Sequence, residues 1–345
     1  SWRSLNISME YPSLDTAKAG AIRFNTDSSQ LEIYNGFEWT GIESTSPNLH
    51  TGGTRGLLMG GIISGRSNQV EFTNIDTTGN FADFGDLVQT ASQGAGMASR
   101  TRAIACGGTP SSPGGTNNID FATIASTGNF ADFGDMVAVG FERVAVANVT
   151  RGVILGNAVA PNALNNIEFL TIATTGSAED FGDCTIGRQA SGAAGNTTRA
   201  IVAGGSYPDA SIDYVTISTK GNASDFGDCT EKIWNTRGGN CGNAVRGLIA
   251  GGGDSLPTNI IQYLTISTLG NTVDFGDRTV AKGQVGHMSS TTRGVFAGAG
   301  EKDTNVVDYV QIMTTGDALD FGDLSANGSD GYGWAAGASN GHGGL

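Results

Sequence analysis

A tetrapeptide that recurs at nearly constant spacing constrains the fold of this chain more than any other feature of its sequence. Asp-Phe-Gly-Asp occurs six times, and successive copies begin 45 to 49 residues apart. An arginine recurs in step with it, and a turn that contains glycine lies between the two markers. Periods of this length are typical of architectures in which neighbouring units complete one another's core. We therefore expect six copies of one structural unit.

The repeated charged residues are predicted to be structural, because a catalytic group is needed once and not in every unit. The arginines are Arg55, Arg102, Arg151, Arg199, Arg246 and Arg293. The first aspartates of the tetrapeptides are Asp83, Asp132, Asp180, Asp225, Asp274 and Asp320. We expect each arginine to lie near an aspartate of an Asp-Phe-Gly-Asp segment, in its own unit or the adjacent one, since a buried guanidinium needs a partner. The phenylalanine is expected to pack between units, and the glycine to allow a bulge or a close backbone approach.

Each unit is predicted to form four short strands. Residues 211–219 alternate between apolar and polar side chains, as expected of a strand. Residues 190–198 are rich in glycine and alanine, and only such small side chains fit where six strands crowd around one axis. Four strands in each 40 to 50 residues indicate an all-β, six-bladed β-propeller.

The ends of the repeat region predict how the ring closes. The first unit begins at Arg55 with no small-residue strand before it, and a spare strand of that kind follows the last unit at Tyr332–Ser339. We expect these two strands to pair, which leaves no free edge. The predicted domains are a β-hairpin module over 1–48 and a propeller over 49–345, with almost no helix.

Composition excludes several classes of protein. Glycine accounts for 54 of 345 residues and charged residues for 15%, which argues against a coiled coil or a helical bundle. The net charge of −14 argues against nucleic-acid binding. No run of 18 apolar residues is present, so we expect no membrane insertion. The first residue is a serine, and we expect the chain to be processed or trimmed.

The non-repeating segment predicts strands separated by polar turns, with Asn35-Gly36 as the second turn. It contains Gly-Ala-Ile-Arg-Phe-Asn-Thr-Asp at 20–27 and Tyr-Asn-Gly-Phe-Glu-Trp at 34–39. These two runs resemble a small β module of bacteriophage tail-fibre and other virion proteins. The Asp-Phe-Gly-Asp repeats resemble those of structural proteins from marine and cyanobacterial phages. The resemblance implies a virion appendage or surface protein.

The repeat unit also resembles the kelch family of propellers. The resemblance rests on the Gly-Gly pairs at 107–108, 204–205 and 251–252 and on an aromatic residue in each third strand. The tryptophan typical of each kelch repeat is missing, so the resemblance implies a kelch-like architecture and not the biology of kelch proteins.

Residues suited to catalysis or metal binding do not form a pattern. His50, His287 and His342 are scattered and are not repeated. We therefore predict no enzyme activity, no cofactor and no metal, although calcium in the acidic loops stays an open alternative. Cys106, Cys184, Cys229 and Cys241 are expected to be unbridged thiols, which fits assembly in a reducing cytoplasm.

Two functional classes remain after this reasoning. The first is a phage tail-fibre, spike or surface-decoration protein whose propeller binds a host-surface glycan or protein. Residues 1–48 would then dock the chain to other virion proteins as an oligomer, with a trimer favoured. The second is a purely architectural capsid or baseplate component. A glycan-cleaving propeller enzyme is a further alternative, and the expected location is the virion, assembled in the host cytoplasm.

The binding residues are expected on the face whose loops vary from unit to unit, because rigid scaffolds carry recognition on loops. That face holds the loops between second and third strands and the crossings between units. The opposite face repeats nearly the same turns in every unit. The candidate contacts are Phe141, Arg143, Tyr207, Trp234 and Asp254.

Overall fold

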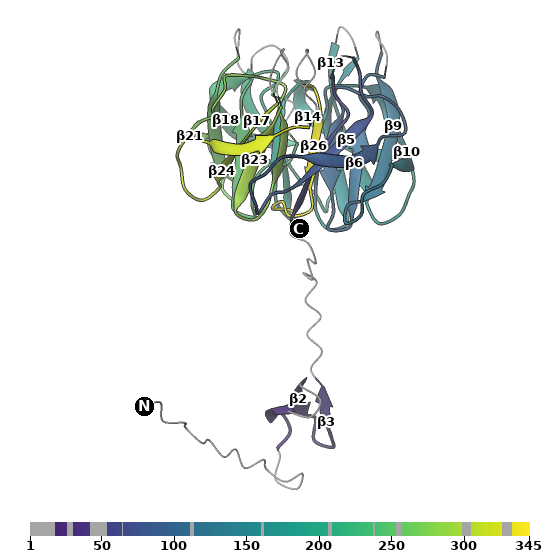
Figure 1. The fold of residues 1–345 in the computed structure, drawn as a ribbon, viewed down its shortest axis with the longest axis vertical. Helices are drawn as coiled ribbons and strands as arrows, with labels where there is room; N and C mark the ends of the chain where they lie inside the picture. Colours follow the sequence, from purple (N-terminus) through teal and green to yellow (C-terminus); the bar gives the residue numbers. More distant parts are fainter. Residues whose placement is uncertain are drawn as a thin grey trace. The chain divides into compact units, whose positions relative to one another are not determined.

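The chain divides into two units, residues 1–51 and 52–345, each described here by itself (Figure 1). The computed structural model describes residues 18–25, 30–41, 54–63, 65–110, 114–159, 162–205, 209–236, 239–252, 257–298, 305–325 and 333–345. Within these ranges the regular elements are β-strands, as predicted, and no helix is present. Accordingly, no described helix is long and apolar enough to cross a bilayer.

The first unit contains a three-stranded antiparallel sheet, β1 (Ile22–Asn25), β2 (Gln30–Tyr34) and β3 (Trp39–Gly41). The turn predicted at Asn35-Gly36 joins β2 to β3. The Asn35 side-chain oxygen accepts hydrogen bonds from the backbone N–H groups of Phe37 and Glu38, at 2.8 and 2.9 Å. This local bonding is the reason asparagine favours such turns.

The second unit contains six antiparallel sheets, numbered here in chain order. Sheet 1 comprises β26 (Ala336–Ser339), β4 (Arg55–Met59), β5 (Gln69–Asn74) and β6 (Ala82–Asp86). Sheet 2 comprises β7 (Ala95–Ala98), β8 (Arg102–Cys106), β9 (Thr116–Thr123) and β10 (Ala131–Gly140). Sheet 3 comprises β11 (Val144–Ala147), β12 (Arg151–Val159), β13 (Asn162–Thr171) and β14 (Glu179–Arg188). Sheet 4 comprises β15 (Gly192–Gly195), β16 (Arg199–Ala203), β17 (Asp209–Thr216) and β18 (Ser224–Ile233).

Sheet 5 has three strands instead of the predicted four: β19 (Arg246–Ala250), β20 (Ile260–Thr265) and β21 (Val273–Asp277). Sheet 6 comprises β22 (Gly286–Ser289), β23 (Arg293–Ala297), β24 (Val306–Gln311) and β25 (Leu319–Asp323). In sheet 5 the place of the first strand is taken by a single bridge between Gly242 and Gly247. Glycine weakens a strand because it has no side chain to pack, and this segment is glycine-rich.

The C-terminal strand completes sheet 1, as the sequence predicted. In β26, Ala336 pairs with Met59 and Ser339 pairs with Gly56 of β4. The last strand of the chain and the first strand of the second unit therefore lie side by side (Figure 1). Of the predicted segment Tyr332–Ser339, Tyr332 lies outside the described residues.

Hydrogen bonds join neighbouring sheets in a cyclic order. In each case the turn glycine before one Asp-Phe-Gly-Asp strand donates its N–H to the phenylalanine carbonyl of the preceding sheet, over 2.7 to 2.9 Å. The donor–acceptor pairs are Gly128–Phe84, Gly176–Phe133, Gly221–Phe181, Gly270–Phe226, Gly316–Phe275 and Gly79–Phe321. The last pair links sheet 6 back to sheet 1.

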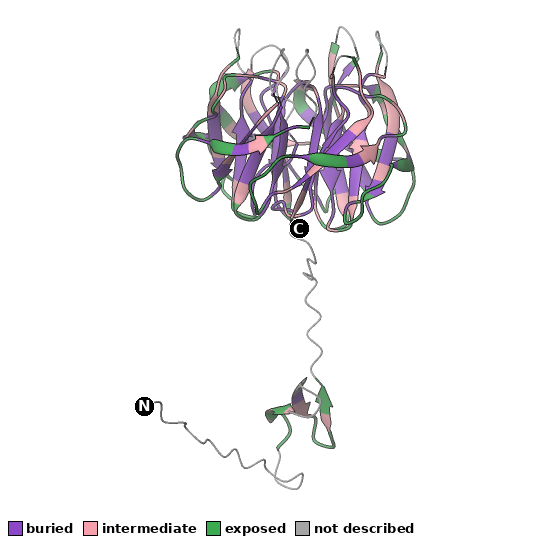
Figure 2. Ribbon diagram, viewed as in Figure 1, coloured by how far each residue is buried: buried purple, intermediate pink, exposed green. Residues whose placement is uncertain are grey.

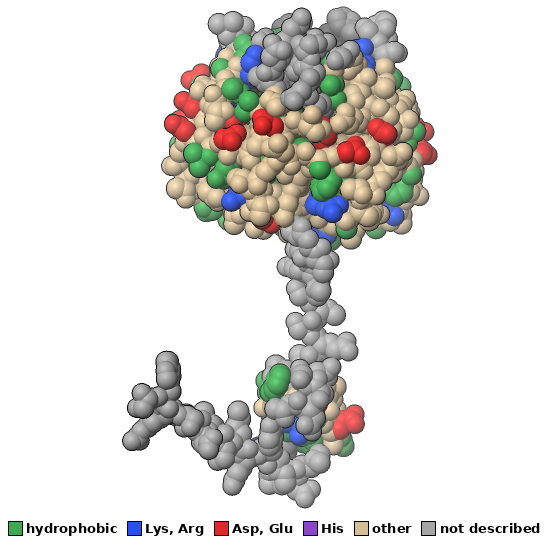
Figure 3. Space-filling view, viewed as in Figure 1, with side chains coloured by type: hydrophobic (Ala, Val, Ile, Leu, Met, Phe, Trp, Pro, Cys, Tyr) green, Lys and Arg blue, Asp and Glu red, His purple; other side chains and the backbone are tan. Residues whose placement is uncertain are grey.

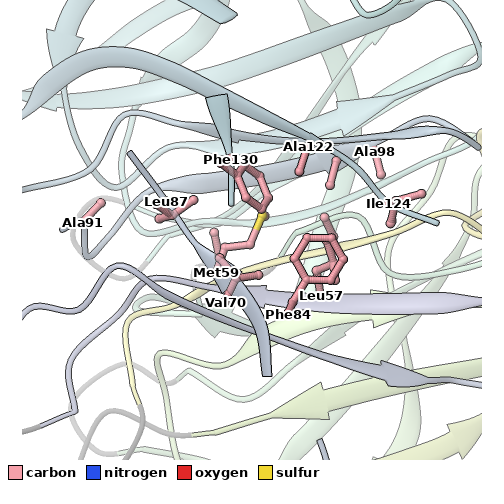
Figure 4. Close-up of a cluster of buried hydrophobic side chains, with 13 residues drawn as sticks. Leu57, Met59, Val70, Phe84, Leu87, Ala91, Ala98, Ala122, Ile124 and Phe130 are labelled. Carbon is pink, nitrogen blue, oxygen red and sulfur yellow. The ribbon is translucent and has the colours of Figure 1, made fainter. Parts of the chain in front are cut away.

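The hydrophobic core is distributed between sheets, and Figure 2 shows buried residues throughout the second unit. Six clusters of buried side chains each combine residues of two neighbouring sheets. In the cluster of Figure 4, Phe130 of sheet 2 lies with Leu57, Met59 and Phe84 of sheet 1. Each sheet therefore depends on its neighbours to bury its apolar faces.

The structure shows why phenylalanine and glycine recur in the Asp-Phe-Gly-Asp strand. Its phenylalanine is buried in every unit and meets the third-strand aromatic edge-on, with centroids 5.7 to 6.0 Å apart. The pairing register shifts between aspartate and glycine, which is the predicted bulge. A Cβ on Gly85 would lie 2.5 Å from the Gly128 carbonyl oxygen, so only glycine fits.

Candidate functional site

The six repeated arginines bind a carbonyl group and an aromatic ring, and the predicted pairing with aspartate is wrong. Each guanidinium lies 4.4 to 4.9 Å from the centroid of the third-strand aromatic ring of its own sheet. Each also donates to the carbonyl of the isoleucine that follows the third strand of the next sheet, at 2.8 to 3.2 Å. The acceptors, in chain order of the arginines, are Ile124, Ile172, Ile217, Ile266, Ile312 and Ile75.

The predicted aspartates lie elsewhere. Asp83, Asp132, Asp180, Asp225, Asp274 and Asp320 are all exposed on the fourth strands. Figure 3 shows acidic side chains on the visible flank of the second unit. No ion pair joins any of the six arginines to either aspartate of a tetrapeptide, and all of these aspartates are described. The arginines point toward the neighbouring sheet, whereas the aspartates face solvent.

A second repeated set, which the sequence analysis missed, occupies the position before the third-strand aromatic. Its members are Glu71, Asp120, Glu168, Asp213, Gln262 and Asp308, all of them buried. Each accepts hydrogen bonds from the end of the fourth strand of the preceding sheet or from the residues just after it, as from Val88, Val137 and Ser325. In five units an acidic residue directly precedes the third-strand aromatic residue. This regularity is present in the sequence and could have identified the set.

Three members of this set pair with buried arginines outside the repeated six. Arg143 Nη1 lies 3.2 Å from Glu168 Oε1, and Arg188 Nη2 lies 3.1 Å from Asp213 Oδ1. Arg278 Nε donates to Asp308 over 3.1 Å. Burial lowers the pKa of Arg143, and the charge of Glu168 opposes that shift. Arg143, a predicted receptor contact, is 1% exposed, so the structure corrects its assignment to an interior ion pair.

Asp120 differs from the other acids of the set. Its Oδ2 accepts a hydrogen bond from the Val88 N–H at 3.1 Å, but its buried Oδ1 has no hydrogen-bond partner. Burial raises the pKa of Asp120 to about 6. This carboxyl group therefore gains a proton more readily than an ordinary aspartate does.

At the other end of the sheets, six non-glycine residues share a left-handed backbone conformation. They are Gln93, Glu142, Ala190, Asn235, Gln284 and Trp334, with φ between 54° and 67°. Five of them donate their N–H to the carbonyl of another member: Gln93 to Trp334, Glu142 to Gln93, Ala190 to Glu142, Gln284 to Asn235 and Trp334 to Gln284. This conformation is uncommon for residues other than glycine, so the shared backbone bonds must stabilise it.

A pocket of about 600 Å³ opens at this end, between sheets 1, 2 and 3. Two aromatic side chains, Phe141 and Trp334, line it together with one cation, Arg66. The remaining lining residues are Ile62, Ser92, Gln93, Thr109, Gly114, Gly115, Val139, Gly140, Ala158 and Val159. The residues come from the loops and crossings that were expected to vary, and Phe141 was among the candidate contacts.

Arg143 and Trp234, the other two candidates among the described residues, do not line this pocket, although Trp234 is 38% exposed. Tyr207 and Asp254 lie outside the described residues. Of the three candidates that the structure describes, only Phe141 therefore belongs to the pocket.

Two buried histidines lie at the centre of the second unit. His342 Nε2 lies 2.8 Å from the Ala98 carbonyl oxygen, while its Nδ1 accepts a hydrogen bond from the Gly344 N–H at 3.1 Å. This arrangement holds the ring in the neutral Nε2–H form. Burial lowers the pKa of His342 to about 4 and, with the nearby Arg278 charge, lowers that of His287 to about 3.

The four cysteines are free and buried, as expected. Burial raises the pKa of Cys184, Cys229 and Cys241 to about 12, which makes these thiols poor nucleophiles. Among the described residues, no three His, Cys, Asp or Glu side chains are grouped so that they would hold a metal ion.

Comparison with known proteins adds no family assignment. The chain matches no protein-family model, and no curated protein matches it in sequence.

Proposed function

We propose that this chain is a non-enzymatic structural protein of a bacteriophage particle, a tail-fibre, spike or surface-decoration protein that binds a host-surface glycan. In this proposal the six sheets are the blades of a β-propeller. The cyclic hydrogen bonds that link sheet 6 to sheet 1 support the propeller, as does the pairing of β26 with β4.

The observation that carries the binding function is the pocket lined by Arg66, Phe141 and Trp334 among the variable loops. The repeated contacts between neighbouring sheets are the same in all six units. The aromatic and cationic residues that line the pocket are not part of these repeated contacts. Pockets with apolar walls and a few convergent polar groups are the usual form of small-ligand sites.

The first unit is proposed to dock the chain to other virion proteins and to form oligomers, with a trimer favoured. In β1, Ile22 is 60% exposed and Phe24 is 55% exposed, and alternation places both on one face of the sheet. Phe37 in the following turn is 91% exposed. A sheet of three short strands buries little apolar area by itself, so these side chains would gain from contact with another chain.

The alternative is a purely architectural capsid or baseplate role. The exposed apolar side chains of the outer strands favour it, among them Val137 at 62% and Leu319 at 60%. Such side chains would pack against neighbouring virion subunits.

The test uses the fluorescently labelled full-length chain and intact host cells. We expect saturable binding that enzymatic removal of surface glycans abolishes, and immunogold labelling of particles should place the chain on an exposed appendage. If the chain is found in particles but binds no cells, the architectural alternative is correct. If antibodies detect it in no particle, the virion assignment is wrong.

A further inference from the structure

We propose that the pocket between sheets 1, 2 and 3 binds a saccharide unit that carries a carboxylate, such as a uronic or sialic acid residue. The proposal rests on the proposed glycan-binding function and specifies the ligand class of the same site. It assigns Arg66 to the carboxylate, Phe141 and Trp334 to the sugar ring, and the polar groups around Thr109 to hydroxyl groups.

Among the described residues, Arg66 is the one cation that lines the pocket, and most of its hydrogen-bond donors have no described partner. Its Nε donates to Thr109 Oγ1 at 3.4 Å, and no carboxylate pairs with it within the described ranges. The two terminal nitrogens have no partner in the described part of the chain, and the proposal assigns them to the ligand. A guanidinium edge matches a carboxylate with two parallel hydrogen bonds.

The polar wall is already ordered without a ligand. Ser92 and Thr109 are joined by a backbone bridge, and their hydroxyl groups lie 2.9 Å apart. The amide of Gln93 is oriented from both sides, because its Nε2 donates to Glu142 at 3.2 Å and its Oε1 accepts from Thr109 at 3.0 Å. Preorganised donors and acceptors lower the entropy cost of binding a hydroxylated ligand.

The aromatic wall is also held in place. The Phe141 backbone pairs with Ala158 of β12 through two hydrogen bonds, of 2.8 and 3.2 Å. The longer hairpin of β12 and β13 supplies Val159, and Figure 1 shows β13 at the upper end of the unit. Aromatic rings beside aliphatic side chains fit the apolar C–H face of a sugar, while its hydroxyl edge needs the polar wall.

The charge of the chain argues for one acidic sugar unit and against a polyanion. The chain carries 33 acidic and 19 basic residues, and its outer flank displays the repeated aspartates. A polyanion needs several cations in a row, whereas this pocket offers one. A single carboxylate at Arg66 is the anion that this site can accept.

The test titrates the full-length chain with methyl glycosides by calorimetry and by saturation-transfer NMR. The probes are methyl glucuronide and methyl sialoside, with methyl glucoside as the neutral control, sodium acetate as the bare anion and an acidic tetrapeptide as the peptide control. We expect the acidic glycosides to bind more tightly than every control. Arg66→Gln should weaken their binding by about 10- to 100-fold, the loss expected for a charge-assisted pair.

Matched variants separate the site from general charge effects. Arg100→Gln makes the same charge change in the β7–β8 turn at the opposite end and should leave binding unchanged. Phe141→Ala should weaken binding of the glycosides but not of acetate. Equal binding of neutral and acidic sugars, unchanged affinity in Arg66→Gln, tighter binding of the peptide, or no sugar binding at all would each overturn the proposal.

The same preparations distinguish this proposal from the proposed function. If Arg66→Gln still binds host cells in a glycan-dependent way, attachment uses another surface and only the ligand assignment fails. If the unmodified chain binds no host cell, the attachment function itself fails. Thermal unfolding of each variant checks that it is folded. Because Arg66 is only half-buried, we expect Arg66→Gln to unfold at the same midpoint temperature as the unmodified chain.

Discussion

The two ends of the six-sheet unit use the same repeat for different purposes. At the end where the arginines lie, every unit repeats one contact, a guanidinium on an aromatic ring and a bond to the next sheet. At the other end the six left-handed residues keep one backbone conformation but carry different side chains, from Ala190 to Trp334. The contacts that recur in every unit hold the sheets together, and the pocket forms where the side chains differ from unit to unit.

If the repeated contacts stabilise the fold and the non-repeated side chains bind the ligand, substitutions in the repeated contacts should destabilise the fold. Substitutions in the pocket should affect binding instead. The interior ion pairs are expected to stabilise the fold, because they connect one sheet to the next. In the pocket, Arg66, Phe141 and Trp334 are partly exposed, whereas Ser92, Gln93 and Thr109 are buried. The following predictions test this division, from the largest expected effect to the smallest.

The largest effect is expected when a buried ion pair loses one partner. Glu168→Ala leaves Arg143 buried without its carboxylate, which should lower the free energy of unfolding by about 3–5 kcal/mol. Urea denaturation measures the loss. Glu179→Ala is the matched control, because Glu179 pairs with Lys220 at the surface with 68% of its side chain exposed. The control should change stability by less than about 1 kcal/mol, and equal losses in both variants would refute the division.

Acid should destabilise the second unit through its buried histidines. Their folded pKa values, about 4 for His342 and about 3 for His287, lie below the ordinary value of 6.5, so the unfolded chain binds more protons as the pH falls. The stability they contribute is complete above pH 6.5 and is lost below it, by about 2 kcal/mol for each histidine between pH 7 and pH 5.

The measurement compares denaturation at pH 7 and pH 5 in the unmodified chain and in His342→Gln. The variant should lose about 2 kcal/mol less than the unmodified chain over this range. Asp120 acts with the opposite sign below pH 6, since its raised pKa lets the folded state take up a proton first. Because both chains retain Asp120, the difference between them isolates the histidine. An unchanged pH dependence in the variant would contradict the assignment.

A smaller and uniform effect is expected from the repeated arginines. Arg199→Ala removes a hydrogen bond to the Ile266 carbonyl and the contact with Tyr214, which together should cost about 1–3 kcal/mol. Arg151→Ala should give a similar loss because it makes the same two contacts in sheet 3. Thermal unfolding of both variants checks the agreement. If their losses differ several-fold, the contacts are not equivalent in energy.

Much of the fold was predictable because the recurring sequence features indicate the strands and turns of each unit. The tetrapeptide, the turn glycine and the small-residue strands each recur, and a spare strand at one end implies a missing strand at the other. The site was less predictable, since Phe141 alone of the three described candidates lines the pocket. Arg66 and Trp334 come from different ends of the chain, and no local pattern marks residues that meet only after the ends are joined.

The sequence by itself determined the number of units, the four-strand pattern in most of them and the pairing of the C-terminal strand with the first unit. These features follow from periodicity and from side-chain size, which are properties of the chain alone. Tertiary structure decided which charged groups are buried. It placed Glu168 and its equivalents between the sheets and left Asp83 and its equivalents in solvent, although both positions recur once in every unit. The physical reason is strand position: the third strand lies between two others and packs its side chains against the neighbouring sheet, while the fourth strand is the outer edge and turns alternate side chains to water.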